Sequence, residues 1–497
     1  MLFSSIPFIY IFFPIVFLGF WLSTVFKSRV VSLVWLFASS IYFYGYYDSR
    51  YIWLLLSSIL VNYGLSLVVL ANNIKKCKLI FTTIGVIFNI ALIGYFKYKN
   101  FFLENTNLLL GTDFTIEKLI VPLGISFFSF QQISYIVDCY KGSTHIIGIL
   151  DYICFVSFFP QILSGPISRF WQLAPQLENL KGISYKNFAV GIMIFSIGLV
   201  KKGVFADYCG EIADPIFNAS LDNSIVLSCS EAWEAAIGYT LQLYFDFSGY
   251  CDMAVGCAKI LGITLPVNFD SPYKSKSIVE FWRRWHMSLS FFLRDYLYIP
   301  LGGNKHGYSR KCCNLLTTML LGGLWHGAAW TFVVWGGLHG LMLVINNIFK
   351  DFLKHINLSS IRDFFAYKMV AWLITFVCVS IAWVFFRAET FSSAWEIVSG
   401  MFSPSLGFSE NRFFDVNNTT LCGVDIGLGF QQFAMIALLL ICIFAKNSVQ
   451  IQERIEKSDS SSFKFNMYLG ACMFVIMMVS LIIIGRSSNS SFIYFNF

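Results

Sequence analysis

The sequence predicts an all-α polytopic membrane protein, and three observations support this prediction. The 497 residues are 57% hydrophobic and only 13% charged, whereas soluble globular proteins carry about 25% charged residues. Apolar runs of about 20 residues recur along the whole chain, and each is long enough to cross a hydrocarbon core of ~30 Å. Because the backbone inside such a core must satisfy its own hydrogen bonds, we expect the spans to be helices.

The apolar runs predict about ten to thirteen membrane helices, some of them re-entrant. The first run follows no basic region and no cleavage site, so we expect it to be retained rather than removed as a signal peptide. No linker of soluble composition divides the chain, which favours a single membrane domain over 1–497. The predicted spans are 2–26, 30–47, 51–71, 79–97, 119–139, 147–165, 188–205, 235–260, 314–347 (two helices), 368–387, 426–445 and 466–485.

The distribution of Lys and Arg predicts the orientation of these spans. The segment 446–464 carries four Lys or Arg residues and should be cytoplasmic, whereas 206–234 carries acidic residues and no Lys or Arg and should face outward. Lys201 and Lys202 count against the second assignment. The last span then runs outward, so the tail 486–497 is expected on the extracytoplasmic face. The net charge of +7 is explained better by Lys and Arg residues in the cytoplasmic loops of a membrane protein than by binding to nucleic acid.

The segment 270–311 is predicted to form basic amphipathic helices at the cytoplasmic interface. Aromatic residues are interleaved there with eight cations against three acids. Anchoring to anionic membrane lipids is the interpretation that this segment alone favours. The alternative is a mouth that attracts a phosphorylated donor such as coenzyme A. The cations are Lys274, Lys276, Arg283, Arg284, Arg294, Lys305, Arg310 and Lys311.

Histidines within apolar sequence are the first candidates for chemistry, because an ionisable side chain in a span is costly and is often functional. His326 and His339 lie in LLGGLWHGAAWTFVVWGGLHG, and His286 lies in EFWRRWHMSLSFFLRDYLYIPLGGNK. The alternative for each is a buried histidine that makes one hydrogen bond between helices. Glycines that would allow close approach to His326 are Gly322, Gly323 and Gly327.

Other catalytic patterns are weak or missing. YFDFSGYCDMAVG places Asp246 and Asp252 in an apolar region, where paired carboxylates could serve acid–base chemistry. Capping of helix N-termini around Ser248 and Gly249 is the interpretation favoured for them. The sequence contains no GxSxG, P-loop or HExxH motif. The thirteen cysteines include no CxxC pair, so neither a metal site nor a disulfide framework is expected.

Four motifs together resemble the membrane-bound O-acyltransferase family. They are FFPQILSGPISR, YFDFSGYCDMAVG, FWRRWHMSLSFFLRDYLYIPLGGN and GLWHGAAWTFVVWGGLHG. They are most similar to the bacterial branch typified by alginate and peptidoglycan O-acetyltransferases, with the D-alanyl exporter of teichoic acid synthesis as a cousin. The resemblance implies a tunnel with His326 as the catalytic histidine and His286 as a second polar position. The residues assigned to substrate binding are Trp282, Arg283, Arg284, Trp285, Trp325 and Asp246.

The resemblance also implies the reaction. Acetyl-CoA is the expected donor substrate, with no bound cofactor, and an envelope polysaccharide outside the bacterial inner membrane is the expected acceptor. A neutral imidazole at His326 would take the proton of the attacking hydroxyl, and His286 would orient a reactant or hold the thioester carbonyl. An extracytoplasmic SGNH-type transferase is the implied partner. The alternatives are D-alanyl transfer from a carrier protein and, in another class, a flippase for a lipid-linked glycan.

The C-terminal sequence SSNSSFIYFNF suggests an acyl relay through Tyr494. The pKa of a phenol, about 10, is close to that of a thiol, about 8.5. A tyrosyl ester would therefore keep much of the activation of a thioester. From Arg486 to Tyr494 the chain reaches about 26–29 Å when extended, which is enough to enter a tunnel mouth. The alternative is an aromatic anchor at the outer interface.

Overall fold

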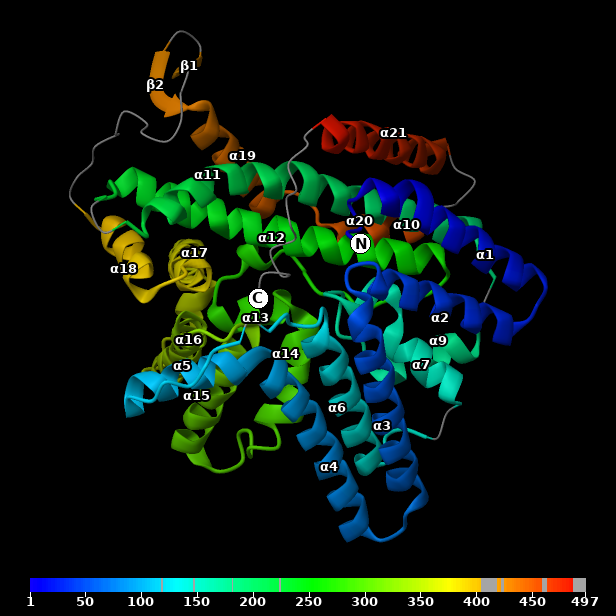
Figure 1. The fold of residues 1–497 in the computed structure, drawn as a ribbon. Coiled ribbons are helices and arrows are strands. Elements are labelled where there is room, and N and C mark those ends of the chain that lie inside the picture. The colour runs from blue at the N-terminus through cyan, green and yellow to red at the C-terminus, as the bar shows by residue number, and fades with distance from the viewer. Residues whose placement is uncertain are drawn as a thin grey trace. The chain divides into compact units, whose positions relative to one another are not determined.

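The chain folds almost entirely into helices (Figure 1). The computed structural model describes residues 1–117, 119–145, 148–180, 182–222, 225–403, 418–421, 424–457 and 463–485. Strands in these ranges are confined to one antiparallel hairpin, β1 (Asn418–Leu421) and β2 (Val424–Gly429), with Leu421 opposite Val424. The prediction of an all-α polytopic membrane protein is confirmed by these helices and by the apolar spans among them.

The helices assemble into two compact units, and each unit joins segments that are distant in the sequence. Unit 1 contains Met1–Val200, Gly249–Val267 and the described residues from Ser448 onward; unit 2 contains Lys201–Ser248 and Asn268–Asn447. The division does not follow two halves of the chain. The single membrane domain over 1–497 therefore stays a prediction, as does the tunnel.

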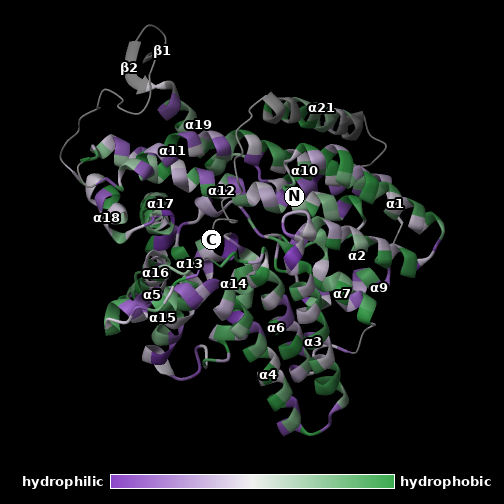
Figure 2. Ribbon diagram, viewed as in Figure 1, coloured by the Kyte–Doolittle hydropathy of each residue, from purple (hydrophilic) through white to green (hydrophobic). Residues whose placement is uncertain are grey.

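Unit 1 is built around helices that pack in sequence-local groups: α1 against α2, and α3, α4 and α6 against one another. Figure 2 shows hydrophobic residues along most of α3 and α4. The elements of unit 1 are η1 (Pro7–Phe12), α1 (Phe13–Val25), α2 (Arg29–Gly45), η2 (Ser49–Tyr51), α3 (Ile52–Ala71), α4 (Lys75–Ile93), η3 (Gly94–Tyr98), α5 (Lys99–Leu110), α6 (Ile125–Lys141), α7 (Ile149–Ser157), α8 (Phe159–Ile162), α9 (Phe170–Glu178), α10 (Tyr185–Val200), α20 (Ser448–Glu456) and α21 (Phe463–Gly485).

Distant segments complete unit 1 around α10. Ala189, Val190 and Met193 on α10 form a buried apolar cluster with Ile455 of α20. Helix α21 packs against the same helix, and the Ser196 hydroxyl donates a hydrogen bond of 3.3 Å to the carbonyl of Cys472 on α21. Helix α10 thus owes much of its packing to the last described segment of the chain.

Unit 2 contains the histidine motifs. Its chain runs through the first part of α12 and then through two short helices into the α15–α16 pair and α17. Its elements are η4 (Lys201–Ala206), α11 (Asp207–Ala219), α12 (Cys229–Ile260, of which 249–260 belong to unit 1), η5 (Pro272–Lys274), α13 (Ile278–Arg284), α14 (Met287–Leu293), η6 (Arg294–Tyr298), α15 (Gly307–His326), α16 (Trp330–His355), η7 (Ser359–Asp363), α17 (Phe365–Arg387), α18 (Phe391–Gly400), the β1–β2 hairpin and α19 (Phe430–Phe444).

Fewer helices than predicted are both long and apolar enough to cross a membrane. Among the described residues there are six, or seven if Gln431–Phe444 and Ser448–Glu456 form one broken span. The prediction of about ten to thirteen counted shorter or more polar segments. The run 147–165, for example, is divided between α7 and α8 at Phe158. The six are Pro7–Val25, Ser49–Ala71, Lys75–Leu110, Tyr185–Ala219, Trp330–His355 and Phe365–Arg387.

The aspartates of the YFDFSGYCDMAVG motif do not cap helices, so that expectation is wrong. Both lie inside α12, which continues without a break for 32 residues. Asp246 is fully buried and lies 2.7 Å from the ammonium nitrogen of Lys202, which also pairs with Asp207 at 2.8 Å. The Asp252 carboxylate accepts a hydrogen bond of 2.7 Å from the Ser448 hydroxyl. Charge pairing, rather than capping, compensates the burial of Asp246.

Glycines bring the backbones of α15 and α16 together beside the histidine that ends α15. A Cβ atom on Gly323 would lie 2.3 Å from the carbonyl oxygen of Phe332, and one on Gly336 would lie 2.3 Å from that of Met319. The expected close approach at Gly323 is therefore confirmed as backbone contact between helices. It holds the last turn of α15 against the first turns of α16.

Candidate active site

His286 lies in a buried polar pocket of unit 2 at the junction of α13 and α14. It occupies the N-cap position of α14 with a left-handed backbone (φ 41°, ψ 54°), and it is fully buried. The Asn268 side-chain oxygen lies 3.1 Å from His286 Nδ1 and also accepts hydrogen bonds from the Ser288 backbone and hydroxyl. Phe247 of α12 contacts the imidazole edge to face, with ring centroids 4.8 Å apart.

These contacts determine which nitrogen of His286 carries the proton. Because the Asn268 side-chain oxygen can only accept, Nδ1 donates, and Nε2 then holds the lone pair of the neutral ring. Burial lowers the pKa of His286 to about 3, since the desolvated ring disfavours the charged form. The imidazole is therefore neutral at physiological pH and presents Nε2 as a hydrogen-bond acceptor.

His326 ends α15 inside a cage of aromatic rings. Its side chain is buried, and the Trp325, Trp335 and Phe386 rings lie 4.8, 5.0 and 5.1 Å from it between centroids. Trp335 belongs to α16 and Phe386 to α17, so three helices surround the imidazole. An apolar cage of this kind excludes water from the imidazole that it encloses.

Trp325 connects the two histidines that the sequence analysis assigned to catalysis. Its ring centroid lies 6.3 Å from that of His286 and 4.8 Å from that of His326. The indole thus contacts both imidazoles, although 39 positions of sequence separate the two histidines. The structure brings His286, Trp325 and His326 into one cluster.

His339 is a third buried histidine of this cluster, and the sequence analysis did not assign it a role. Trp335 separates it from His326, with ring centroids 4.8 Å from His339 and 5.0 Å from His326. Trp282 Nε1 donates a hydrogen bond of 3.3 Å to His339 Nδ1. The neutral ring therefore carries its proton on Nε2, the opposite of His286. The sequence signal for His339 was its place in a second His-Gly pair, Leu338-His339-Gly340, which follows Trp325-His326-Gly327 in the same apolar stretch.

The other predicted substrate-binding residues have separate surroundings. Trp282 contacts the cluster through His339. Trp285 is buried against Trp383, with ring centroids 4.8 Å apart, and belongs to the core beside the cluster. Arg283 is exposed, and Asp246 is held in its ion pair with Lys202.

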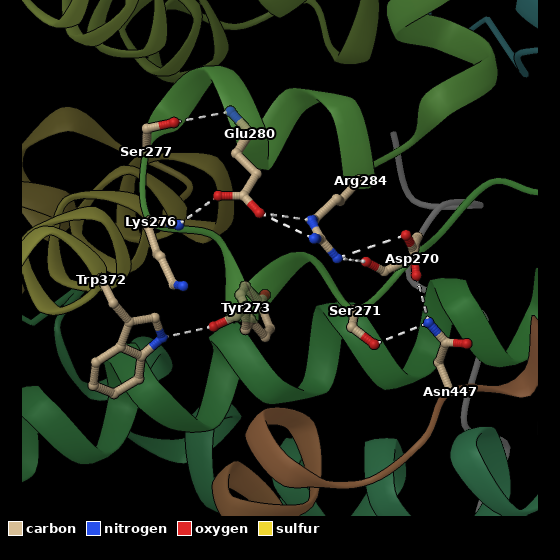
Figure 3. Close-up of polar contacts among 9 residues, drawn as sticks. All are labelled: Asp270, Ser271, Tyr273, Lys276, Ser277, Glu280, Arg284, Trp372 and Asn447. Carbon is tan, nitrogen blue, oxygen red and sulfur yellow. Dashed lines mark hydrogen bonds and ion pairs between the residues drawn. The ribbon is translucent and has the colours of Figure 1, made fainter. Parts of the chain in front are cut away.

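Arg284 is part of a network that fixes the segment before α13 (Figure 3). Its guanidinium lies 3.0 Å from the Glu280 carboxylate and donates to the Asp270 carbonyl oxygen at 3.1 Å. Asn447 donates hydrogen bonds to Asp270 and Ser271 at 2.7 and 2.9 Å. Arg284 therefore acts as an internal link that holds α13, and with it Trp282, in place.

If the resemblance holds, replacing Asn268 by alanine is expected to lower the rate of the implied acyl transfer by roughly 10- to 100-fold, because a misplaced reactive group costs rates of this order. The substitution removes the acceptor that holds His286 Nδ1 and Ser288. Asn268→Asp keeps an acceptor in the same position and should retain most of the activity. Transfer rates and melting temperatures of the two variants check this. Equal loss in both, or loss that follows the melting temperature, would contradict the positioning role.

The fold and the buried histidine cluster define a polytopic helical membrane protein with a water-excluding imidazole site. The family model of MBOAT, the membrane-bound O-acyltransferase family, matches residues 17–387. The chain belongs to this family, and it is an acyltransferase.

Three relatives place the chain within the family. A peptidoglycan O-acetyltransferase of Helicobacter pylori is 37% identical over 100% of this chain and 98% of its own length. A probable alginate O-acetylase AlgI of Pseudomonas aeruginosa is 37% identical over 90% of this chain and 83% of its own. A teichoic acid D-alanyltransferase of Streptococcus thermophilus is 30% identical over 48% of this chain and 60% of its own.

The C-terminal tail that carries Tyr494 lies outside the described residues. Its extracytoplasmic location and its part in an acyl relay stay predictions.

Proposed function

We propose that the chain moves acetyl groups from cytoplasmic acetyl-CoA across the membrane for O-acetylation of a cell-envelope polysaccharide. The observation that carries this proposal is the cluster of His286, Trp325 and His326, in which aromatic rings enclose the His326 imidazole and exclude water from it. The choice of acetyl is supported by relatives named as O-acetyltransferases or O-acetylases, which match nearly the whole chain. The relative named as a D-alanyltransferase matches about half of it.

In the proposed reaction, His326 acts as the general base. Its imidazole takes the proton of an acceptor hydroxyl as the hydroxyl oxygen attacks the thioester carbonyl carbon. A C–O bond forms, the C–S bond breaks, and the proton passes to the departing coenzyme A sulfur. The Trp325, Trp335 and Phe386 rings exclude water that would otherwise hydrolyse the thioester. A neutral imidazole becomes charged only when it takes this proton, so the apolar cage holds no charge before the reaction begins.

The neighbouring histidines are assigned different tasks by their hydrogen bonds. Because His286 Nδ1 donates to Asn268, Nε2 holds a lone pair that can accept a hydrogen bond, so we assign His286 to orienting a hydroxyl rather than to holding a carbonyl oxygen. His339 carries its proton on Nε2 and holds Trp335 between itself and His326. Trp282 and Arg284 act through His339 and α13 as positioning residues.

The first acceptor in this proposal is the phenol of Tyr494, which would pass the acetyl group onward outside the membrane. An extracytoplasmic SGNH-type transferase would then move it to the polysaccharide. The pKa values of a thiol and a phenol, about 8.5 and 10, make the first transfer feasible. The corresponding location is the bacterial cytoplasmic membrane, with the C-terminus outside.

The donor can be tested with inverted membrane vesicles, which expose the cytoplasmic face to the medium. With isotopically labelled acetyl-CoA outside, we expect base-labile label to accumulate inside vesicles that contain the protein and not in vesicles without it. Labelled D-alanyl carrier protein should give no such label. Accumulation from the D-alanyl carrier alone would replace the acetyl assignment with the second candidate function. Uptake of intact acetyl-CoA without ester formation would contradict acyl transfer.

A further inference from the structure

An apolar groove runs between α16 and α17 in unit 2, away from the histidine cluster. Its volume is about 420 Å³, within the range of roughly 300–1,000 Å³ of ligand sites in proteins. The α16 wall consists of positions 342, 345, 346 and 349, which form one helical face, and α17 contributes a matching face. The lining residues are Lys276, Ile278, Met342, Ile345, Asn346, Phe349, Tyr367, Val370, Ala371, Ile374, Thr375 and Cys378.

The chemistry of this lining suits a hydrocarbon chain. Most side chains are apolar, and Asn346, Thr375 and Tyr367 are polar but uncharged. Helices α16 and α17 are both long and apolar enough to cross a membrane, so in a membrane we expect a groove between them to face lipid rather than water. An apolar groove in that environment is filled by acyl chains, because water gains no hydrogen bonds there.

Among the described residues that line the groove, Lys276 is the only charged one, and the hydrogen bonds and ion pairs of the neighbouring network do not involve its ammonium group. Its backbone N–H donates to the Glu280 carboxylate at 3.0 Å, and that carboxylate is also held by Arg284. Figure 3 shows the Lys276 side chain extending away from this network. Among the described residues, the Lys276 ammonium makes no ion pair, whereas the Lys274 ammonium donates to the carbonyl of Ala445 at 2.7 Å.

We propose that the α16–α17 groove binds one acyl chain of an anionic phospholipid, and that Lys276 binds the lipid phosphate. A coenzyme A molecule fits these residues poorly, since its several phosphates and its adenine ring need more cations and hydrogen-bond donors than the groove offers. Ile278 lines the groove one helical turn before Trp282, which contacts His339. A bound lipid therefore supports the helix that positions the active site.

Binding of defined lipids to the full-length protein tests this proposal. The delipidated protein in detergent is titrated with phosphatidylglycerol or with phosphatidylcholine and analysed by native mass spectrometry. One Lys contributes about a fivefold gain in affinity for an anionic lipid surface. We therefore expect Lys276→Glu to weaken phosphatidylglycerol binding about fivefold or more and to change phosphatidylcholine binding little. Lys354→Glu, on the exposed end of α16, is the matched charge control and should have no such effect.

A second pair of variants tests the groove itself. Ala371→Trp fills the groove and should abolish the tight binding of both lipids, whereas Leu373→Trp, on an exposed face of the same helix, should not. Melting temperatures equal to that of the unmodified protein show that each variant is folded. The proposal is overturned if the Lys276 and Lys354 variants behave alike, or if the two tryptophan variants do. Displacement of the lipid by coenzyme A would also overturn it.

Discussion

Replacement of His326 by alanine is expected to reduce acyl transfer by about 10²–10⁴-fold, the usual contribution of a general base. His326 is the imidazole enclosed by Trp325, Trp335 and Phe386. Glutamine at this position approximates the size of the ring but cannot take a proton, so His326→Gln should lose as much activity as His326→Ala. The measurement is the rate of acetyl transfer at saturating acetyl-CoA.

The control for this prediction is His355→Ala, which removes an exposed imidazole at the end of α16 and should leave the rate unchanged. A second control is donor binding: both His326 variants should still bind coenzyme A, because the base acts on the acceptor hydroxyl. If His326→Gln retained more than about a tenth of the rate, a base worth 10²-fold or more could not be assigned to this residue.

Replacement of Tyr494 by phenylalanine is expected to abolish acetyl transfer to the extracytoplasmic acceptor. The substitution removes only the phenolic oxygen and keeps the ring, so an aromatic anchor at the interface would be unaffected. The measurement is intact-mass analysis after incubation with isotopic acetyl-CoA, followed by peptide mapping of the C-terminus. We expect one acetyl group on Tyr494 in the unmodified protein and none in the variant.

Tyr468→Phe is the matched control, because Tyr468 is an exposed tyrosine of α21 close to the same end of the chain. It should be acetylated and active like the unmodified protein. The His326→Ala variant, which keeps Tyr494, should also leave the tail unlabelled, because His326 takes the proton of the Tyr494 hydroxyl when the acetyl group is transferred to it. Full transfer by Tyr494→Phe would show that the acetyl group passes directly from coenzyme A to the final acceptor.

Composition and apolar periodicity were sufficient to predict the fold class, because hydrophobicity along the chain directly reflects the surrounding lipid. They did not predict how the spans divide. The polar residues that α12 buries are compensated by partners elsewhere, such as the Lys202 ammonium for Asp246, and no local pattern announces such pairs. The helix caps expected around Ser248 and Gly249 are not formed, because helix α12 continues through both residues.

The motifs selected the residues of the candidate site but did not predict their environments. His286 and His326 could be selected because ionisable groups in apolar sequence stand out. Asn268 could not, since an asparagine before a motif is common in loops, and only the folded backbone brings its side-chain oxygen to Nδ1 of His286. Trp285 follows α13 as an extended C-cap residue and packs against Trp383, an environment that the motif alone did not predict.

The interleaving of the two units has a consequence for biosynthesis. Helix α10 is made before residue 200, but its partners α20 and α21 begin only at Ser448. At about 5–20 residues per second, the ribosome needs about 12–50 s to add the intervening stretch. Throughout that interval the nascent α10 lacks Ile455 and its neighbours, and the side of α10 that packs against α20 and α21 must be shielded by lipid or by the insertion machinery. A stop codon anywhere before α20 would therefore leave this side of α10 uncovered, so quality control can recognise a truncated product by a defect in one of its earlier helices.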